Sequence, residues 1–262
     1  MRIICIIAVS LSCFIGRLHA QVILLPDLQH AVSIDATLTN LFIIEQGKHR
    51  MLKLDLDGEL IDSLGSLGTG DYQFDTPVDI EASNGLRLYI SDTGNNRIQI
   101  YDRRFQYLSR VEASEGQRRF QPQELVSTLF GEVLFYEARS RGIKIFDENG
   151  QERPRFILPS EIESIDEIKL TERRLYVLDK KQNVIHELEP NGRYRGFFPA
   201  KGVTAFNVMN DELIVAKEGV VSTVDESSIF ATNIPNTIQD LVFIDSKGIY
   251  ILTSTQLLKI SL

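Results

Sequence analysis

The sequence contains very little cysteine and no tryptophan. Among 262 residues there are two cysteines, Cys5 and Cys13, and both lie within the first twenty positions. The rest of the chain therefore cannot build a disulfide framework or a cysteine-based metal site. Only four histidines are present, which leaves little material for a histidine-rich metal centre. The lack of tryptophan also removes the commonest aromatic platform for binding sugars.

Basic residues are too few for a nucleic-acid-binding protein. The chain has 28 lysines and arginines against 36 acidic residues, a net charge of -8. Arg2 and Arg17 belong to the first twenty residues, so residues 21–262 are more acidic still. Binding to phosphate backbones needs an excess of lysine and arginine. We therefore expect no nucleic-acid partner.

The first twenty residues have the pattern of a secretory signal peptide. Arg2 precedes an apolar run from Ile3 to Ile15, which is too short to cross a bilayer as a helix. Leu18-His19-Ala20 is an acceptable cleavage site before Gln21. A retained N-terminal anchor is one alternative. Lipidation at Cys13 is another, although Ser10 stands where a lipid-attachment motif has an aliphatic residue.

This pattern predicts that residues 1–20 are removed and that residues 21–262 form an exported protein, periplasmic or extracellular. No later stretch is long and apolar enough to span a membrane.

A repeat of about 40 residues fills the chain from residue 21 onward. Each copy shows short apolar strands with period-two alternation, and the second strands of the copies share an apolar motif. These strands begin at Leu41, Leu88, Leu134, Leu175, Leu213 and Ile249. No amphipathic helical stretch of useful length appears between them.

Six such repeats of four antiparallel strands predict an all-β fold, a six-bladed β-propeller. The last repeat ends at Leu262 after three strands. Val22–Leu25 supplies the missing fourth strand and closes the ring, which removes an exposed sheet edge. Tight hairpins are expected at Asp57-Gly58, Asn149-Gly150 and Asn191-Gly192, because these dipeptides accept positive φ.

The second repeat resembles the NHL repeat. The similarity is carried by Phe74–Ile80, with Pro77 and Asp79, and by Leu88–Tyr101, with Asp92, Gly94 and Asn95-Asn96-Arg97. Repeats one and three are looser copies, and repeats four to six keep only the strand rhythm. The resemblance implies a six-bladed propeller that usually serves as a binding platform. Members of the family bind proteins or RNA, and some bacterial ones are extracellular sensor domains.

Related six-bladed propellers include enzymes, namely peptide-amidating lyases and lactonases of the gluconolactonase type. The resemblance to the lyases implies a metal held by several histidines. Here His30, His49 and His186 fall before a first strand, in a hairpin loop and inside a third strand. Because these positions are not equivalent, we do not expect the three histidines to converge on one metal.

Equivalent positions in the first strands carry acidic side chains. Aligning the six repeats places Ser33 and Ala205 in register with four carboxylates, Asp79, Glu124, Glu167 and Asp240. A propeller brings these positions together around its axis, where carboxylates repel one another. One interpretation is a site for Ca²⁺, another divalent cation or a cationic group. The other is structural, with each carboxylate accepting backbone N–H groups of the neighbouring blade.

Basic residues lie in the loops between second and third strands. These loops share one face, here called the top face, with the connections between blades. The candidates for contacts with a ligand or partner on this face are Arg50, Arg97, Arg139, Arg141 and Lys180. For Arg50 and Arg97 the alternative is an ion pair with Glu45 or Asp92 that fixes the hairpin.

Three hypotheses about function follow. The first is an exported, monomeric, non-enzymatic propeller that binds a protein, a peptide or a small ligand on its top face. It rests on the closed repeat fold and on the lack of nucleophile, zinc or phosphate-binding motifs. The second is a metal-dependent lactonase-like or esterase-like hydrolase, or a lyase, that uses the four carboxylates. The third is a structural part of a larger envelope or secretion assembly.

Overall fold

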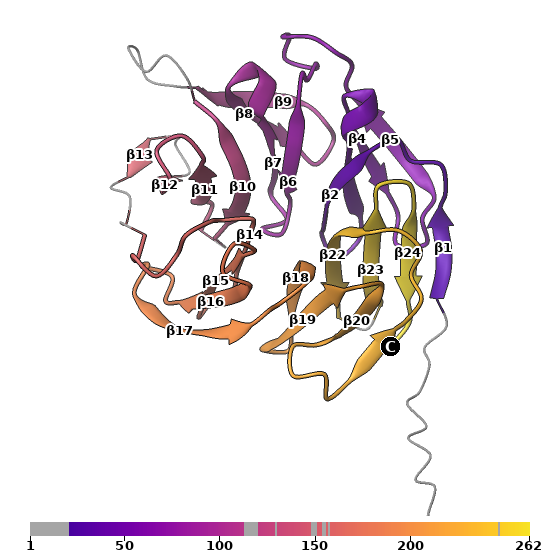
Figure 1. The fold of residues 1–262 in the computed structure, drawn as a ribbon. Helices are drawn as coiled ribbons and strands as arrows, with labels where there is room; N and C mark the ends of the chain where they lie inside the picture. The colour runs from indigo at the N-terminus through magenta and orange to yellow at the C-terminus, as the bar shows by residue number, and fades with distance from the viewer. Residues whose placement is uncertain are drawn as a thin grey trace, which may run out of the picture.

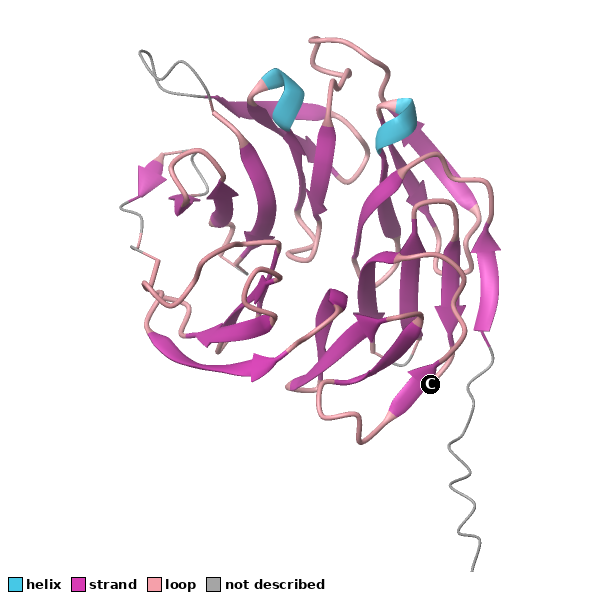
Figure 2. Ribbon diagram, viewed as in Figure 1, coloured by secondary structure: helices cyan, strands magenta, loops and turns pink. Residues whose placement is uncertain are grey.

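The described part of the chain is a six-bladed β-propeller. The computed structural model describes residues 21–112, 120–128, 130–147, 151–153, 156, 158–245 and 247–262. In these residues six sheets of four antiparallel strands each surround a common axis (Figure 1). Two single-turn 3-10 helices, η1 (Gln46–Lys48) and η2 (Thr93–Asn95), interrupt the pattern (Figure 2). The predicted all-β propeller is therefore confirmed.

Each blade runs outward from the axis, strand by strand. Blade 1 consists of β2 (Ala31–Ala36), β3 (Leu41–Glu45), β4 (Arg50–Leu54) and β5 (Leu60–Leu64). Blade 2 consists of β6 (Pro77–Glu81), β7 (Arg87–Asp92), β8 (Arg97–Asp102) and β9 (Tyr107–Glu112). Blade 3 consists of β10 (Pro122–Ser127), β11 (Val133–Glu137), β12 (Gly142–Phe146) and β13 (Glu152–Arg153).

Blade 4 consists of β14 (Glu167–Leu170), β15 (Leu175–Asp179), β16 (Val184–Leu188) and β17 (Tyr194–Pro199). Blade 5 consists of β18 (Val203–Met209), β19 (Glu212–Lys217), β20 (Val220–Thr223) and β21 (Ile229–Ala231). Blade 6 consists of β22 (Ile238–Ile244), β23 (Gly248–Thr253), β24 (Leu257–Ile260) and β1 (Gln21–Leu25).

The position of a strand within its blade explains its composition. Second strands such as β3, β11 and β15 are buried at every residue, because both of their faces pack against neighbouring blades. This burial accounts for their nearly continuous apolar runs. The outer strand β17 alternates between half-buried and exposed residues, as expected of a strand with one face in water.

The hydrophobic core lies between the blades. Within the described residues it divides into six clusters, one at each interface of neighbouring blades. At the interface of blades 1 and 2, for example, Phe42, Met51, Phe74 and Tyr101 are fully buried. Each blade is therefore stabilised by its two neighbours, and closure of the ring buries the last pair of faces.

The N-terminal strand closes the ring as predicted. β1 pairs antiparallel with β24, and Gln21 lies opposite Ile260. Blade 6 thus contains three strands from the C-terminal end of the chain and one from residues 21–25. The turn of blade 1 packs against this seam: Gly58 has φ +90°, and a Cβ atom there would lie 2.6 Å from the Cβ of Leu24. Glycine is required at this position for both reasons.

Two predictions concern residues that the structure does not describe. The signal peptide at residues 1–20 lies outside the described residues, as does the hairpin at Asn149-Gly150. Gly192 has φ +89°, which confirms the predicted Asn191-Gly192 turn. In the described part of the chain, no helix has the length and apolar character needed to cross a membrane.

Candidate functional site

A cavity of about 190 Å³ lies on the propeller axis. The first strands of the blades surround the axis (Figure 1). The inward-facing residues of these strands form two tiers. The first tier is the predicted acidic ring, which we define as Asp79, Glu124, Glu167 and Asp240; of these four, Asp79 and Glu124 border the cavity. The second tier lies two residues further along each strand and consists of Asp35, Glu81, Val126, Lys169, Asn207 and Val242.

The backbone changes register next to the ring. In five of the six blades, the pairing of the first and second strands has a bulge just before or at the ring position. In blade 2, for instance, the bulge lies between Pro77 and Asp79. A bulge re-aims the side chains beside it. The recurrence of this bulge explains why equivalent residues of different blades meet at the axis.

Three members of the acidic ring connect neighbouring blades. The N–H of Leu125 donates to Asp79 Oδ2 at 2.6 Å, and that of Phe206 donates to Glu167 Oε2 at 3.1 Å. The N–H of Ile34 donates to Asp240 Oδ2 at 2.9 Å, across the seam between blades 6 and 1. In every case the donor follows the ring position of the next blade. These bonds agree with the structural interpretation of the ring, in which each carboxylate accepts backbone N–H groups of the neighbouring blade.

The second tier repeats this arrangement. The N–H of Ala82 donates to Asp35 Oδ2 at 2.6 Å, and the Ser127 hydroxyl donates to Glu81 Oε1 at 2.8 Å. The Asn207 amide donates to the carbonyl of Leu241 at 2.9 Å. The sequence analysis did not single out Asp35 and Glu81. Their signal was the period-two spacing from Ser33 and Asp79, which places them on the same face of the strand.

Lys169 provides a positive charge inside the ring. Its Nζ lies 3.1 Å from Glu167 Oε1 and 3.2 Å from Asp240 Oδ1. The side chain thus reaches from blade 4 to blade 6, past the ring position of blade 5, where Ala205 has only a methyl group. The sequence analysis also missed Lys169.

The buried carboxyls hold protons more tightly than carboxyls in water do. Burial raises the pKa of Asp79 to about 7 and that of Glu167 to about 8, although hydrogen bonds and Lys169 oppose the shift. Burial raises the pKa of Glu81 to about 8 and that of Asp35 to about 6. Burial disfavours the charged Lys169 ammonium, but the carboxylates of Asp240 and Glu167 outweigh it and hold its pKa well above the ordinary value.

Glu124 differs from the other ring members. Within the described residues it takes part in no hydrogen bond or ion pair, and it borders the axial cavity. Burial raises its pKa well above the ordinary value, and the negative charges of Asp79 and Glu167 add to the effect.

Three of the four ring carboxylates are already engaged by other groups of the protein. Each of these three accepts a backbone N–H group, and two of them share the Lys169 ammonium. Among the described residues, no group of three or more histidines, cysteines or carboxylates has an arrangement suited to a metal. His186 is buried beside Asp179, and Nδ1 of His49 contacts the carbonyl of Asp75, so these two histidines lie in separate environments.

Two of the five basic residues of the top-face loops are fixed within their own hairpins. Nε of Arg97 donates to Asp92 Oδ2 at 3.0 Å, and its terminal nitrogens donate to the carbonyls of Thr69, Gly70 and Gln73. Its side chain is only 3% exposed. Arg50 pairs with the buried Glu45. Both residues thus form the ion pairs with Glu45 and Asp92 that the sequence offers as the alternative to ligand contacts.

The other three, Arg139, Arg141 and Lys180, are exposed on the top face of blades 3 and 4. They flank the connection between these blades. Nη2 of Arg141 donates to the carbonyl of Glu163 at 2.7 Å, and the backbone N–H of Lys180 donates to Asp166 at 2.9 Å. A hollow of about 270 Å³ lies beside Arg141 and is lined by the connection itself, including Pro159, Ile162 and Ile165.

Sequence comparison places one blade in a known repeat family. Residues 74–101, which form most of β6 to β8, match the family model of the NHL repeat. Together with the six blades, this match confirms the expected likeness to NHL-repeat propellers. No curated protein matches the chain by sequence.

Several solved structures share the fold over most of their length. A gluconolactonase from Xanthomonas campestris has a TM-score of 0.69 at 14% identity, covering 92% of this chain and 89% of that one. A streptogramin B lyase has a TM-score of 0.64 at 12% identity, with coverages of 92% and 96%. Virginiamycin B lyase from Staphylococcus aureus has a TM-score of 0.62 at 15% identity, with coverages of 90% and 81%. At these identities the likeness shows the fold alone.

Proposed function

We propose that this chain is an exported, monomeric, non-enzymatic propeller that binds an acidic segment of a protein or peptide partner on the top face of blades 3 and 4. The observation that carries the proposal is the group of exposed cations Arg139, Arg141 and Lys180, of which Arg141 lines a hollow of about 270 Å³. None of these three side chains has an ion pair within the described residues. Export is supported by the signal-peptide pattern of residues 1–20.

The charges around the hollow favour an acidic partner. Glu163, on the connection between the blades, is already paired with Lys181 at 2.7 Å. Asp166 is occupied by the Ser164 hydroxyl and by the N–H of Lys180. The cationic groups therefore remain available, while the nearest carboxylates are partly neutralised. Complementary charge of this kind speeds association and selects among partners more than it adds affinity.

The test compares two charge-reversed triple variants of residues 21–262. In the first, Arg139→Glu, Arg141→Glu and Lys180→Glu change the top face. In the matched control, Arg103→Glu, Arg104→Glu and Arg193→Glu make the same change of charge in exposed turns between third and fourth strands. These turns lie on the opposite face.

Each protein is immobilised and incubated with envelope and secreted fractions of cells. The captured partner is identified by mass spectrometry and titrated in purified form. We expect binding by the wild type and the control and its loss in the top-face variant. Equal binding by both triple variants would overturn the proposed surface.

The second candidate function is a metal-dependent hydrolase or lyase. Glu124 favours it, because this carboxyl has no hydrogen bond within the part of the chain that the structure describes and borders the axial cavity. Calorimetric titration with Ca²⁺, Mg²⁺, Mn²⁺ and Zn²⁺ separates the two functions. Micromolar binding that is lost in the Glu124→Gln/Glu167→Gln double variant would support the enzyme and justify a screen of lactones and esters. No heat from any of the four ions is the result that the binding function predicts.

A further inference from the structure

Three exposed apolar side chains lie at the tips of neighbouring hairpins. They are Leu38, Leu86 and Phe130, in the turns between the first and second strands of blades 1, 2 and 3, and they are 84%, 64% and 85% exposed. Because the strands of a blade alternate in direction, these turns lie on the face opposite the top face. They also surround the axis, since the first strands are the innermost strands of the blades (Figure 1). We call the three residues the apolar arc.

Hydrogen bonds connect the bases of these three hairpins. Asp35 lies at the base of the hairpin of blade 1 and accepts the N–H of Ala82, at the base of the hairpin of blade 2, at 2.6 Å. The Ser127 hydroxyl, at the base of the hairpin of blade 3, donates to Glu81 Oε1 at 2.8 Å. Within each turn a side-chain oxygen accepts a backbone N–H group, from Thr37, Asn84 and Thr128 respectively. The three tips therefore stand next to one another on a connected base.

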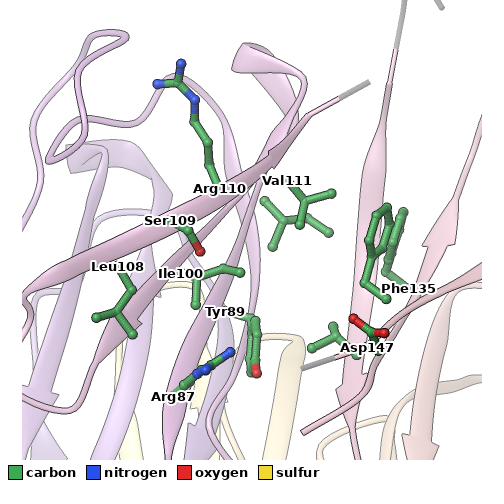
Figure 3. Close-up of a pocket in the computed structure, with 12 residues that line it drawn as sticks. Arg87, Tyr89, Ile100, Leu108, Ser109, Arg110, Val111, Phe135 and Asp147 are labelled. Carbon is green, nitrogen blue, oxygen red and sulfur yellow. The ribbon is translucent and has the colours of Figure 1, made fainter. Parts of the chain in front are cut away.

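The surface around the apolar arc carries little charge. Residues 37–40, 82–86 and 128–132 contain a single charged residue, Glu132. The side chain of Arg87, which follows Leu86, is half-buried and lines the cavity between blades 2 and 3, where Figure 3 shows it beside Tyr89. The equivalent turns of blades 4 to 6 instead expose charged side chains, namely Glu172, Arg173, Asp211, Asp245 and Lys247. The apolar tips thus occupy one half of this face.

The shape and charge of the apolar arc indicate the kind of partner. Single exposed apolar residues are ordinary, but a group of them marks an interaction surface. The three side chains protrude from turn tips and line none of the cavities at the axis, beside Arg141 or between blades 2 and 3. They therefore fit a partner that they can penetrate, as leucine and phenylalanine side chains penetrate the headgroup region of a bilayer.

The net charge of -8 disfavours an anionic lipid surface, and the nearly uncharged arc needs none. We propose that the apolar arc docks the propeller on a zwitterionic phospholipid surface, with Leu38, Leu86 and Phe130 inserted between the headgroups. This inference goes beyond the proposed function and does not depend on it. The acidic partner would bind the opposite face, which a docked propeller turns toward the water.

The test uses the lack of tryptophan in the chain, because Phe130→Trp then places a single fluorophore at one tip of the arc. The matched control is Phe197→Trp, since Phe197 is 60% exposed on the outer strand β17, away from the arc. Both variants of residues 21–262 are titrated with small vesicles of phosphatidylcholine and with vesicles of phosphatidylcholine and phosphatidylglycerol. Scanning calorimetry checks that each variant is folded.

Two further variants in the Phe130→Trp background test the other tips. Leu38→Asp/Leu86→Asp places charge on the arc. Leu67→Asp/Leu108→Asp is its control, because it makes the same change at two exposed leucines elsewhere on the molecule.

We expect phosphatidylcholine vesicles to shift the emission of Phe130→Trp saturably to shorter wavelength, also at roughly 0.5 M salt, where surface charges are screened. The emission of Phe197→Trp should not shift. Leu38→Asp/Leu86→Asp should lower the affinity for vesicles by roughly tenfold or more, and its control should not.

No shift with either kind of vesicle, or an equal shift in Phe197→Trp, would overturn the proposal. A shift that requires phosphatidylglycerol and disappears in salt would overturn it as well, because the binding would then depend on charge. A shift with envelope proteins but not with vesicles would overturn the lipid surface and assign the arc to a protein partner.

Discussion

Raising the pH from roughly 6.5 to 8 should destabilise the folded protein, because the buried carboxyls near the axis hold protons that the unfolded chain releases. Glu81 and Glu167 have pKa values of about 8 in the fold, and Asp79 of about 7. A raised pKa means that the folded state binds more protons. The stability from these protons is complete below the ordinary carboxyl pKa, and it is lost as the pH rises through the folded values.

Other titrating groups do not reverse this sign in the chosen window. Burial lowers the pKa of His186, so its contribution to stability rises with pH only up to its ordinary value of 6.5. Hydrogen bonds outweigh burial and lower the pKa values of Glu137 and Asp179, and their contribution is lost only in acid. Between roughly pH 6.5 and 8, the axial carboxyls therefore set the slope.

The magnitude follows from linkage. Each proton retained on folding changes the free energy of unfolding by about 1.4 kcal/mol per pH unit. For a domain of this size, 1 kcal/mol corresponds to roughly 2–4 °C in Tm. One retained proton therefore lowers Tm by about 3–6 °C per pH unit. We expect at least this slope, because several carboxyls contribute and their mutual repulsion keeps some of them protonated.

Scanning calorimetry of the wild type and the Glu124→Gln variant provides the assay. Glutamine has nearly the shape of protonated glutamate and cannot ionise. Because the pKa of Glu124 is raised in the fold, the Tm of the variant should fall less steeply with rising pH than that of the wild type, by up to one proton. Glu59→Gln, at an exposed position, is the control and should follow the wild type. A wild-type Tm that stays level or rises across this window would refute the reasoning.

Three further predictions follow from named contacts. Arg97→Ala should lower the free energy of unfolding by about 3 kcal/mol in urea titrations, because it leaves the buried Asp92 unpaired. Arg50→Ala should cost less, because its side chain is 30% exposed, and equal losses would contradict this account. Lys169→Met should create a cation site, so that Ca²⁺ raises the Tm of the variant but not that of the wild type. An equal rise in both would show that the lysine does not take the place of a metal. A chain starting at Pro26 lacks β1 and should have a much lower Tm than the Val22→Thr/Ile23→Thr variant. The double variant is the control, because it keeps the strand and changes only exposed side chains. Equal Tm values would show that β1 does not close the ring.

The six blades could be predicted from the sequence because strand patterning is local. Period-two alternation and the apolar second strands recur in every repeat, and one strand was missing from the last repeat. The acidic ring was predictable for the same reason, since equivalent positions of a closed repeat meet at the axis. The alignment of the repeats therefore identifies the residues that lie at the axis.

The contacts that the ring carboxylates make could not be predicted, because these contacts depend on distances across the axis. Lys169 reaches Asp240 only past blade 5, where the ring position is Ala205. Arg97 and Arg141 occupy similar loops in the sequence, yet one is buried among carbonyls and the other is exposed.

Closure by β1 also sets the order in which the molecule can be completed. β1 is the first strand of the fold to be synthesised, and its partner β24 is the last. Until Leu257–Ile260 emerge, β1 has no partner, and its backbone N–H and C=O groups are free to pair with other chains. Val22 and Ile23 stay more than half exposed even in the finished ring. β1 is therefore an unpaired apolar strand, prone to association with other chains, during almost the whole synthesis of the protein. The propeller becomes a closed ring only when β24 has been synthesised and pairs with β1.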